Sequence, residues 1–261
     1  MSAELDHLVI NTRFDTDAAA ELFAALGFTL TPRGYHSLGS INHLIVFEQG
    51  YLELIGLPSG TDRLRQEVLE SPVGIDGLVL ACDDPIATHE RLVRQGFAAQ
   101  PVQRFSRPVE VDGVEQEARF ATVRLPGEFA AGRVYFCHHE TPELVWRREW
   151  LGHANGVSGI ARLTVVSAEP EESARRYARL GGFDGDFQLD IVDAQALVAR
   201  FGVLAWMGVQ PPERFAAISL RCADPSLLAQ RASALGLAHG PTPAGVVVSI
   251  PAFATLLEFV Q

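Results

Sequence analysis

Three stretches of this sequence share one pattern: Gly74–Pro85 (GIDGLVLACDDP), Gly159–Pro170 (GIARLTVVSAEP) and Glu213–Pro225 (ERFAAISLRCADP). Each is a run of apolar and β-branched residues that closes on an acidic residue followed by proline. This order is typical of a β-strand, then a helix N-cap, then a proline at the first helical position. The three stretches therefore predict three strand-to-helix units, which set the frame for the rest of the chain.

The helices that follow these strands share one length. In each unit an acidic residue precedes a glycine by twelve positions, in the pairs Asp84 and Gly96, Glu169 and Gly181, Asp224 and Gly236, and also Asp15 and Gly27 near the start. Glycine just past the last turn is the usual left-handed end of a helix. The fourth pair predicts a fourth unit, at the N-terminal end of the chain.

The segments after each helix predict strands. HLIVFEQ and YLELIGL flank Gly50 like the arms of a hairpin, and ARFATVRL and RVYFCHHE form a similar pair. The third unit continues as LDIVDAQALVARFGVLAWMGV, which lacks a clear turn, and we interpret it as a shortened or altered hairpin. Each unit is thus roughly βαβββ, and the chain belongs to the α+β class.

The four units predict two halves, each a pair of βαβββ modules. Residues 1–140 would form the first half, residues 157–261 the second, and residues 141–156 the linker between them. A length of 261 residues is comfortable for two domains.

Composition excludes several classes of function. The formal net charge of -11 argues against nucleic acid or an anionic membrane as a partner, because phosphate binding needs clustered basic residues. The three cysteines form no CxxC motif, so neither a disulfide framework nor a zinc knuckle is indicated. Neither a signal peptide nor a membrane span is expected. We expect a cytoplasmic protein that binds a small-molecule substrate or ligand, in a form compatible with a homodimer.

Four segments resemble the glyoxalase-like proteins of the vicinal-oxygen-chelate superfamily, which also includes bleomycin-resistance proteins and extradiol dioxygenases. They are LDHLVIN (Leu5 to Asn11), GSINHLIVF (Gly39 to Phe47), GYLELIG (Gly50 to Gly56) and VYFCHHETPELVW (Val134 to Trp146). The resemblance implies that the four βαβββ modules pair into two incomplete β-barrels. In many members it also implies a divalent metal such as Zn, Ni, Mn or Fe. It fixes no single reaction, because one fold serves many functions.

The resemblance also implies a set of metal ligands. His7 matches the first-strand ligand and Glu53 the last-strand ligand of the first module. Gly77 stands where the second module would carry its histidine. His139 is favoured over His138 for the remaining position, because strand alternation turns it to the same face as Tyr135 and Cys137. Two histidines and one carboxylate would leave coordination positions open for a substrate.

The second half lacks this set. Arg162 and Ala217 occupy its first-strand positions, and Glu258 matches Glu53 without a histidine partner. We therefore expect the cavity of residues 1–140 to be polar and open and that of residues 157–261 to be filled and without metal.

Three functions fit this resemblance. The first is a metal-dependent glyoxalase-type lyase or isomerase, in which the metal and the catalytic carboxylate of Glu53 stabilise an enediolate and move a proton. The second is a metal-free protein that binds a small molecule or confers resistance by sequestering it. The third is an extradiol-type dioxygenase, against which the ligand-poor second half counts.

Overall fold

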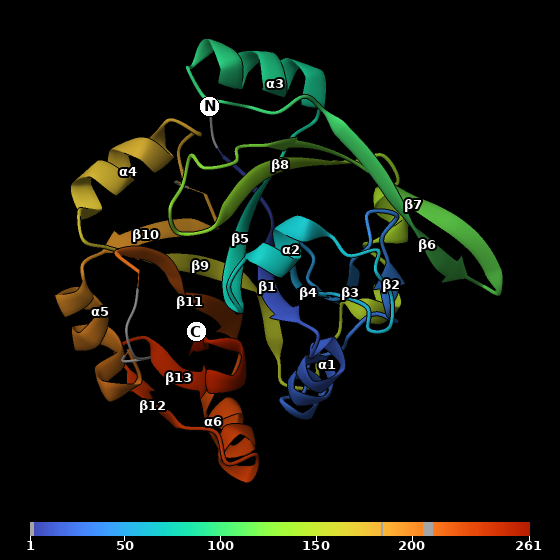
Figure 1. The fold of residues 1–261 in the computed structure, drawn as a ribbon. Helices are drawn as coiled ribbons and strands as arrows, with labels where there is room; N and C mark the ends of the chain where they lie inside the picture. Colours follow the sequence, from blue (N-terminus) through green and yellow to red (C-terminus); the bar gives the residue numbers. More distant parts are fainter. Residues whose placement is uncertain (1–2, 184, 206–210) are drawn as a thin grey trace.

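The structure is a computed structural model that describes residues 3–183, 185–205 and 211–261. Two β-sheets and the helices around them make up this part of the chain (Figure 1). The eight-stranded sheet has the order β2-β3-β4-β1-β5-β8-β7-β6, and the six-stranded sheet has the order β10-β9-β11-β14-β13-β12. This arrangement confirms the predicted α+β class with two paired, incomplete barrels.

The first sheet and its helices occupy the first part of the chain. Their bounds are β1 (Leu5–Arg13), α1 (Thr16–Ala25), β2 (Gly34–Tyr35), β3 (Ile41–Val46), β4 (Tyr51–Gly56), α2 (Gln66–Glu70), β5 (Gly74–Ala81), α3 (Pro85–Arg94), β6 (Gln103–Val111), β7 (Val114–Arg124) and β8 (Arg133–His139). Two short 3-10 helices, Pro142–Leu144 and Arg148–Trp150, follow in the connecting segment.

The second sheet and its helices follow. Their bounds are β9 (Val157–Ser167), α4 (Pro170–Ala178), β10 (Gln188–Val192), α5 (Ala194–Phe201), β11 (Glu213–Cys222), α6 (Pro225–Ala234), β12 (His239–Thr242), β13 (Gly245–Ile250) and β14 (Thr255–Val260), with 3-10 helices at Gly202–Ala205 and Pro251–Phe253. None of the helices in the described ranges is long and apolar enough to cross a bilayer.

The four helices predicted from the acidic-residue-to-glycine spacing are confirmed. α1, α3, α4 and α6 each begin directly after the acidic residue. The side chains of Asp84 and Asp224 accept hydrogen bonds from the first turns of α3 and α6. Gly27 and Gly96, which follow α1 and α3, have φ of 92° and 81°, the left-handed conformation that favours glycine.

The first sheet curls until its edges approach each other. β1 runs parallel to β4 and antiparallel to β5, and β5 runs parallel to β8. The loop after β2 reaches β6, where the Ser37 amide donates to the Ser106 carbonyl at 3.0 Å. The concave face of this sheet is therefore the interior of a nearly closed barrel.

The third unit departs from the βαβββ pattern, because a helix replaces the expected hairpin. β10 pairs with β9 in parallel, and α5 follows at once. Asp193 caps α5 by accepting a hydrogen bond from Ala196 at 2.7 Å. Leu197 and Phe201 of α5 pack against Ala217, Val247 and Leu256 of the second sheet. The helix thus fills the concave face of that sheet.

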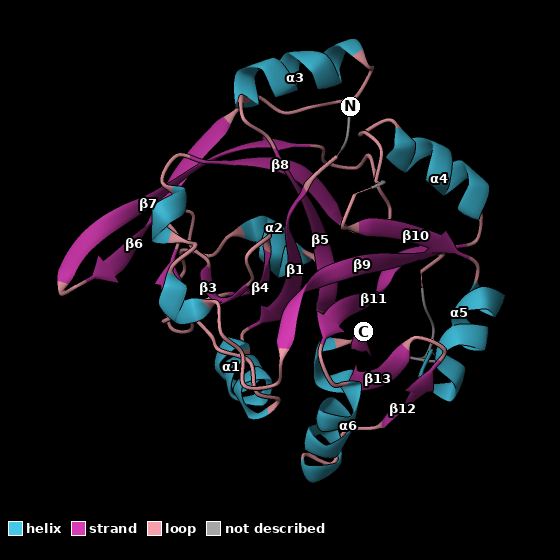
Figure 2. Ribbon diagram, turned by 180° about the vertical axis from the view of Figure 1, so that it is seen from behind, coloured by secondary structure: helices cyan, strands magenta, loops and turns pink. Residues whose placement is uncertain are grey.

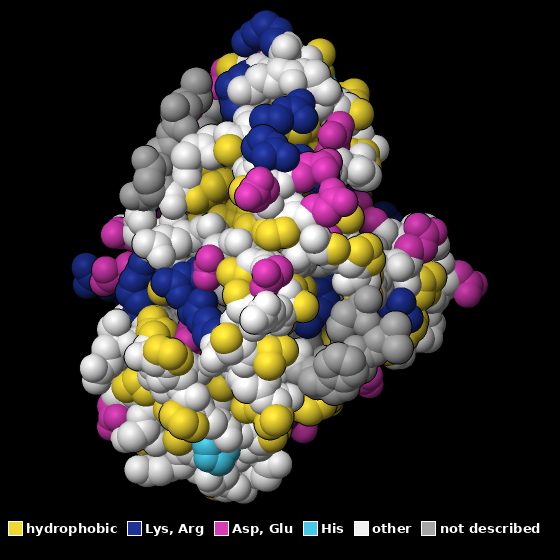
Figure 3. Space-filling view, turned by 90° about the vertical axis from the view of Figure 1, so that its left-hand side faces the viewer, with side chains coloured by type: hydrophobic (Ala, Val, Ile, Leu, Met, Phe, Trp, Pro, Cys, Tyr) yellow, Lys and Arg dark blue, Asp and Glu magenta, His cyan; other side chains and the backbone are white. Residues whose placement is uncertain are grey.

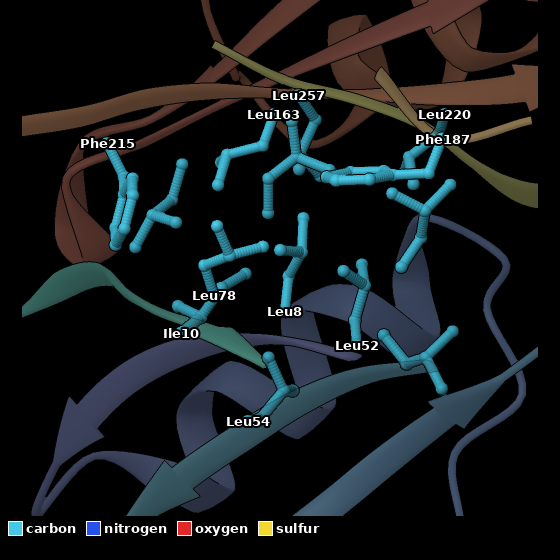
Figure 4. Packing of buried hydrophobic residues seen from close by; sticks show 14 of the residues in the cluster. Leu8, Ile10, Leu52, Leu54, Leu78, Leu163, Phe187, Phe215, Leu220 and Leu257 are labelled. Atoms are coloured by element: carbon cyan, nitrogen blue, oxygen red, sulfur yellow. The ribbon is translucent and has the colours of Figure 1, made fainter. Parts of the chain in front are cut away.

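The main hydrophobic core lies between the two sheets. Leu8, Leu52 and Leu78 of the first sheet face Leu163, Leu220 and Leu257 of the second (Figure 4). All six are fully buried. The helices surround the strands (Figure 2). Hydrophobic, basic and acidic side chains are mixed on the face that carries α4 and α5 (Figure 3). Because the core uses the outer face of the first sheet, its inner face is free to carry polar residues.

Candidate functional site

A small polar chamber lies inside the first barrel. Its volume is about 20 Å³, room for about one water molecule or ion. The lining residues are His7, His36, Asn42, Leu44, Tyr51, Glu53, Arg65, Phe105, Arg107, Phe120, Thr122, Tyr135 and Cys137. The expectation of a polar interior is correct, but the expectation of an open one is wrong. Large inward side chains such as Tyr51, Phe105 and Arg107 occupy the space.

His7 and Glu53 face each other across this chamber. His7 lies on β1 and Glu53 on β4, and the parallel register pairs His7 with Tyr51 and Val9 with Glu53. The Nε2 atom of His7 lies 3.8 Å from Oε2 of Glu53. The His7 ring stacks on Tyr51 with centroids 4.3 Å apart, which fixes its plane. Two of the three ligands suggested by the sequence therefore lie together.

Asp6 fixes the orientation of His7 from behind. The β1–β5 register shifts between Leu5 and His7, so Asp6 occupies a bulge. Its carboxylate contacts Nδ1 of His7 and lies 3.1 Å from Nε2 of His139. Burial alone would raise the pKa of Asp6, but His139 and His7 together hold it well below its ordinary value. An ionised Asp6 accepts one hydrogen bond from Nδ1 of His7 and another from Nε2 of His139. With its proton on Nδ1, His7 keeps a free lone pair on Nε2.

Glu53 is held by its neighbours in a charged form. The Nδ2 atom of Asn42 donates to Oε1 of Glu53 at 2.7 Å, and Nε2 of His36 lies 4.0 Å from the same oxygen. Burial would raise the pKa of Glu53, but His36, His7 and the Asn42 hydrogen bond lower it. Oε2 remains directed toward His7. Burial in turn lowers the pKa of His36 from 6.5 to about 3, against the opposing effect of Glu53.

The strand register puts Tyr135 in the position that corresponds to Glu53. Glu53 pairs with Val9 of β1, and Tyr135 pairs with Val79 of β5, the counterpart of Val9. The hydroxyl of Tyr135 lies 3.4 Å from Nε2 of His7. Burial raises the pKa of this phenol, so it is a hydrogen-bond donor. Sequence reasoning missed Tyr135, because only the pairing across β5 and β8 identifies its position.

His139 lies at the edge of the site, beyond Asp6. Its side chain points inward, as strand alternation predicts, and contacts the rings of Tyr51, Phe120 and Trp146. Its nearest polar partner is the Asp6 carboxylate, and the described chain offers no partner for its Nδ1 atom. His138 points the other way and bonds the carbonyl of Cys82 at 3.0 Å.

A second group of ligand-type atoms lies around His139. Among the described residues, Asp6, Cys137 and His139 offer ligand atoms that all lie within 4.8 Å of one another. Burial raises the pKa of the Cys137 thiol well above its ordinary value, so the free thiol is protonated. The first barrel therefore contains two neighbouring sets of metal-ligand atoms, His7 with Glu53 and Asp6 with Cys137 and His139, and the contact between Asp6 and His7 connects them.

Arg107 brings a cation into the chamber. It lies on β6 and only 3% of its surface is exposed. Its Nε and Nη2 atoms have no hydrogen-bond partner within the described ranges. A buried guanidinium with free donors is costly unless an anionic or carbonyl oxygen occupies the space beside it. No sequence pattern indicated Arg107, because an arginine on a polar strand is typical of a solvated edge.

In the second half, the carboxylate that corresponds to Glu53 is Glu258, and its partner is an arginine. Glu258 on β14 is fully buried, like its counterpart Glu53. Arg200 of α5 binds it through two nitrogens, Nε at 3.2 Å and Nη2, and Ser219 donates to it at 2.7 Å. The Arg200 guanidinium therefore lies beside Glu258 in the second half, whereas His7 lies beside Glu53 in the first half.

The His7–Glu53 pair fits a divalent metal. Ligand bonds of about 2.1 Å allow two donor atoms to lie up to roughly 4.2 Å apart across one ion. The observed 3.8 Å lies within this span. An imidazole whose second nitrogen binds a carboxylate is the usual arrangement around protein-bound metals. Both donor atoms line a chamber of the right size.

Comparison with known proteins identifies the family and the fold. The model of the family described as "Glyoxalase-like domain" matches residues 5–181. None of the curated proteins matches the chain by sequence. Among solved structures, a hypothetical protein from Staphylococcus aureus is 11% identical with a TM-score of 0.65, over 99% of this chain and 100% of its own.

Two further solved structures carry functional names. A mutant of 4-hydroxymandelate synthase from Streptomyces coelicolor is 13% identical with a TM-score of 0.55, over 100% of this chain and 92% of its own. A xylose isomerase-like TIM barrel/4-hydroxyphenylpyruvate dioxygenase fusion protein is 12% identical with a TM-score of 0.57, over 100% of this chain and 49% of its own. At such identities these likenesses show the fold alone.

Proposed function

Because this chain belongs to the glyoxalase-like domain family, we propose that it is a metal-dependent enzyme of the glyoxalase type, with its active site in the first barrel. The substrate would be a small molecule whose neighbouring oxygens chelate the ion, and the reaction a lyase or isomerase step. The observation that carries this proposal is the 3.8 Å gap between Nε2 of His7 and Oε2 of Glu53.

Residues in and beside the chamber have distinct roles in this proposal. His7 and Glu53 hold the ion, which when bound would act as a Lewis acid on a substrate oxygen. Asp6 orients His7 and keeps its Nε2 lone pair directed into the chamber. His139 was suggested by the sequence as a third ligand; we propose that it supports Asp6 instead, from 3.1 Å.

The chain also offers groups that manage charge and protons. Arg107 donates its free N–H groups to negative charge that develops on the substrate. Glu53 is the catalytic carboxylate, but Asn42 occupies one of its oxygens and His7 faces the other. The Nε2 atom of His36 lies 4.0 Å from Oε1 of Glu53, so this imidazole is a neighbour of the catalytic carboxylate without a hydrogen bond to it.

A metal-free binding function is the second candidate. Gly77 and Tyr135 stand at two of the four ligand positions that the pairing of β1 and β5 defines. Neither is among the usual zinc ligands. The chamber would then receive a single oxygen-bearing group of a ligand, bound by Arg107 and Tyr135, and no ion would be required.

Metal titration separates the two candidates. Chelator-treated protein is titrated with Zn²⁺, Ni²⁺ and Mn²⁺ against a chromophoric competitor, beside the variants His7→Ala and Glu53→Gln. The proposal predicts one tight site per chain that both substitutions weaken by at least a hundredfold. His138→Ala is the matched control, because His138 bonds the Cys82 carbonyl outside the chamber. Equal affinity in the wild type and His7→Ala would rule the metal enzyme out.

A further inference from the structure

An open cleft lies at the end of the first barrel, between α2 and the loop that joins β7 to β8. Its volume is about 440 Å³, enough for a small metabolite. Its lining residues are Glu67, Ser71, Pro72, Asp76, Gln100, Arg124, Leu125, Pro126, Gly127, Phe129, Gly132, Arg133, Val134 and Tyr135. The proposed function assigns no role to most of this surface.

Three arginines surround a single glutamate at this cleft. Glu67 binds Nη2 of Arg65, Nη1 of Arg124 at 2.7 Å and Nη1 of Arg133 at 3.3 Å. Asp76 binds Nε of Arg133 at 2.6 Å. Three guanidinium groups against two carboxylates leave one excess positive charge. A protein with a net charge of -11 therefore concentrates cations at this point.

Arg124 and Arg133 each have an N–H group without a hydrogen-bond partner among the described residues. The Nη2 atoms of Arg124 and Arg133 are buried and have no hydrogen-bond partner among the residues that the structure describes. Both side chains line the cleft and are 16% and 17% exposed. Because both side chains line the cleft, their guanidinium groups can meet a ligand's anionic oxygens there, and charge-assisted hydrogen bonds from arginine to an oxyanion are strong.

The cleft ends where the candidate active site begins. Tyr135 is the one described residue that lines both the cleft and the chamber. Its hydroxyl lies 3.4 Å from Nε2 of His7. A molecule held in the cleft by one end would therefore extend along Tyr135 toward the His7–Glu53 pair.

From this arrangement we infer that the cleft binds a small acidic molecule, whose carboxylate or phosphate group pairs with Arg124 and Arg133. The binding stands on the cleft alone, whereas its identification as the substrate rests on the proposed function. The substrate would then carry an acidic group at one end and chelating oxygens at the other.

The test uses acids without chelating oxygens, in protein freed of metal. Succinate, inorganic phosphate and the uncharged analogue succinamide are titrated into chelator-treated full-length protein at low ionic strength, and binding is followed by calorimetry or ligand-observed NMR. We expect saturable binding of succinate or phosphate and none of succinamide. The tighter of the two acids identifies which oxyanion the cleft prefers.

Three variants locate the binding. Arg124→Ala should weaken it by about tenfold or more, because charge-assisted hydrogen bonds are lost. Arg124→Lys keeps the charge but loses the fork and should give an intermediate loss, which covers the case in which Arg124→Ala unfolds. Glu67→Gln should tighten binding, since it removes the internal anion that competes for the same arginines. A purely structural arginine network predicts no such gain.

Two controls separate this inference from the metal site. Arg94→Ala removes an arginine on α3 that is 70% exposed, and it should leave binding unchanged. His7→Ala should bind the acidic probe normally even when it no longer binds zinc. Failure of both acids to saturate, or equal binding by the wild type and a folded Arg124→Ala, would overturn the inference. Acid binding without metal binding would leave the cleft standing while the proposed function fails.

Discussion

Replacing Arg200 by methionine should destabilise the second half strongly at neutral pH. Arg200 is the cationic partner of Glu258, which is fully buried on β14. Without Arg200 the carboxylate keeps neutral hydroxyl donors, Ser219 at 2.7 Å and Thr242, but no cationic partner among the described residues. A buried unpaired carboxylate is relieved by taking up a proton. The substitution therefore removes the ion pair, and the folded chain must instead bind a proton at Glu258, which costs free energy at neutral pH.

The size of the effect follows from that cost. The ordinary pKa of a glutamate is 4.5, and in the folded chain Arg200 and Ser219 lower it further despite burial. Protonating such a group at pH 7 costs about 3 kcal/mol, at roughly 1.4 kcal/mol per pH unit. We therefore expect Arg200→Met to lower the free energy of unfolding by about 3 kcal/mol at pH 7 and by about 1 kcal/mol at pH 5.

Urea unfolding followed by far-UV circular dichroism measures both values. The double variant Arg200→Met with Glu258→Gln should recover most of the loss, because a neutral amide replaces the carboxylate, and its difference in stability from the wild type should be the same at pH 5 and pH 7. A loss for Arg200→Met that is the same at pH 5 and pH 7, or no recovery in the double variant, would refute the pairing of Arg200 with Glu258 as the reason.

Three further predictions concern the first barrel. Burial lowers the pKa of His36 from 6.5 to about 3, so the unfolded chain binds a proton that the folded chain does not, and stability falls as the pH drops from 6.5 toward 3. His36→Gln should remove about 2 kcal/mol of the loss between pH 7.5 and pH 5 in urea unfolding; an unchanged pH profile would contradict this. Asp6→Asn should weaken zinc binding about tenfold or more in a competition titration, and unchanged affinity would show that Asp6 does not orient His7. A Cβ atom at Gly77 would lie 2.7 Å from Cγ2 of Val9. Gly77→Ala should therefore lower the free energy of unfolding by about 1–3 kcal/mol. A free energy of unfolding equal to that of the wild type would contradict this and show that the strand shifts to accept the methyl group.

The predicted helices came from local signals, and these were sufficient. Acidic cap residues, prolines at the first helical position and terminal glycines act within one helix, so a single sequence reveals them. α5 carried the same kind of signal, with Asp193 as its cap and Leu197 and Phe201 one turn apart. The expectation of a hairpin there overrode this signal, and the structure corrects it.

The site was harder to predict because it depends on strand pairing. His7 and Glu53 follow from the module pattern, but the correspondence of Tyr135 with Glu53 requires the register of β5 against β8. The position of Asp6 behind His7 depends on a β-bulge between Leu5 and His7, which no residue pattern in the sequence predicts. Arg65, Arg107 and Arg124 read as surface residues in the sequence, and only the curl of the first sheet turns them toward the chamber and the cleft.

The location of a bound metal tests the central proposal most directly. Crystals of the wild-type protein soaked with Zn²⁺ would be measured at the zinc absorption edge, and the anomalous difference map would be computed. We predict one strong peak in the chamber between Nε2 of His7 and the carboxylate of Glu53. A peak at Asp6, Cys137 and His139 instead, or no peak in the first barrel at saturating zinc, would contradict the proposed active site.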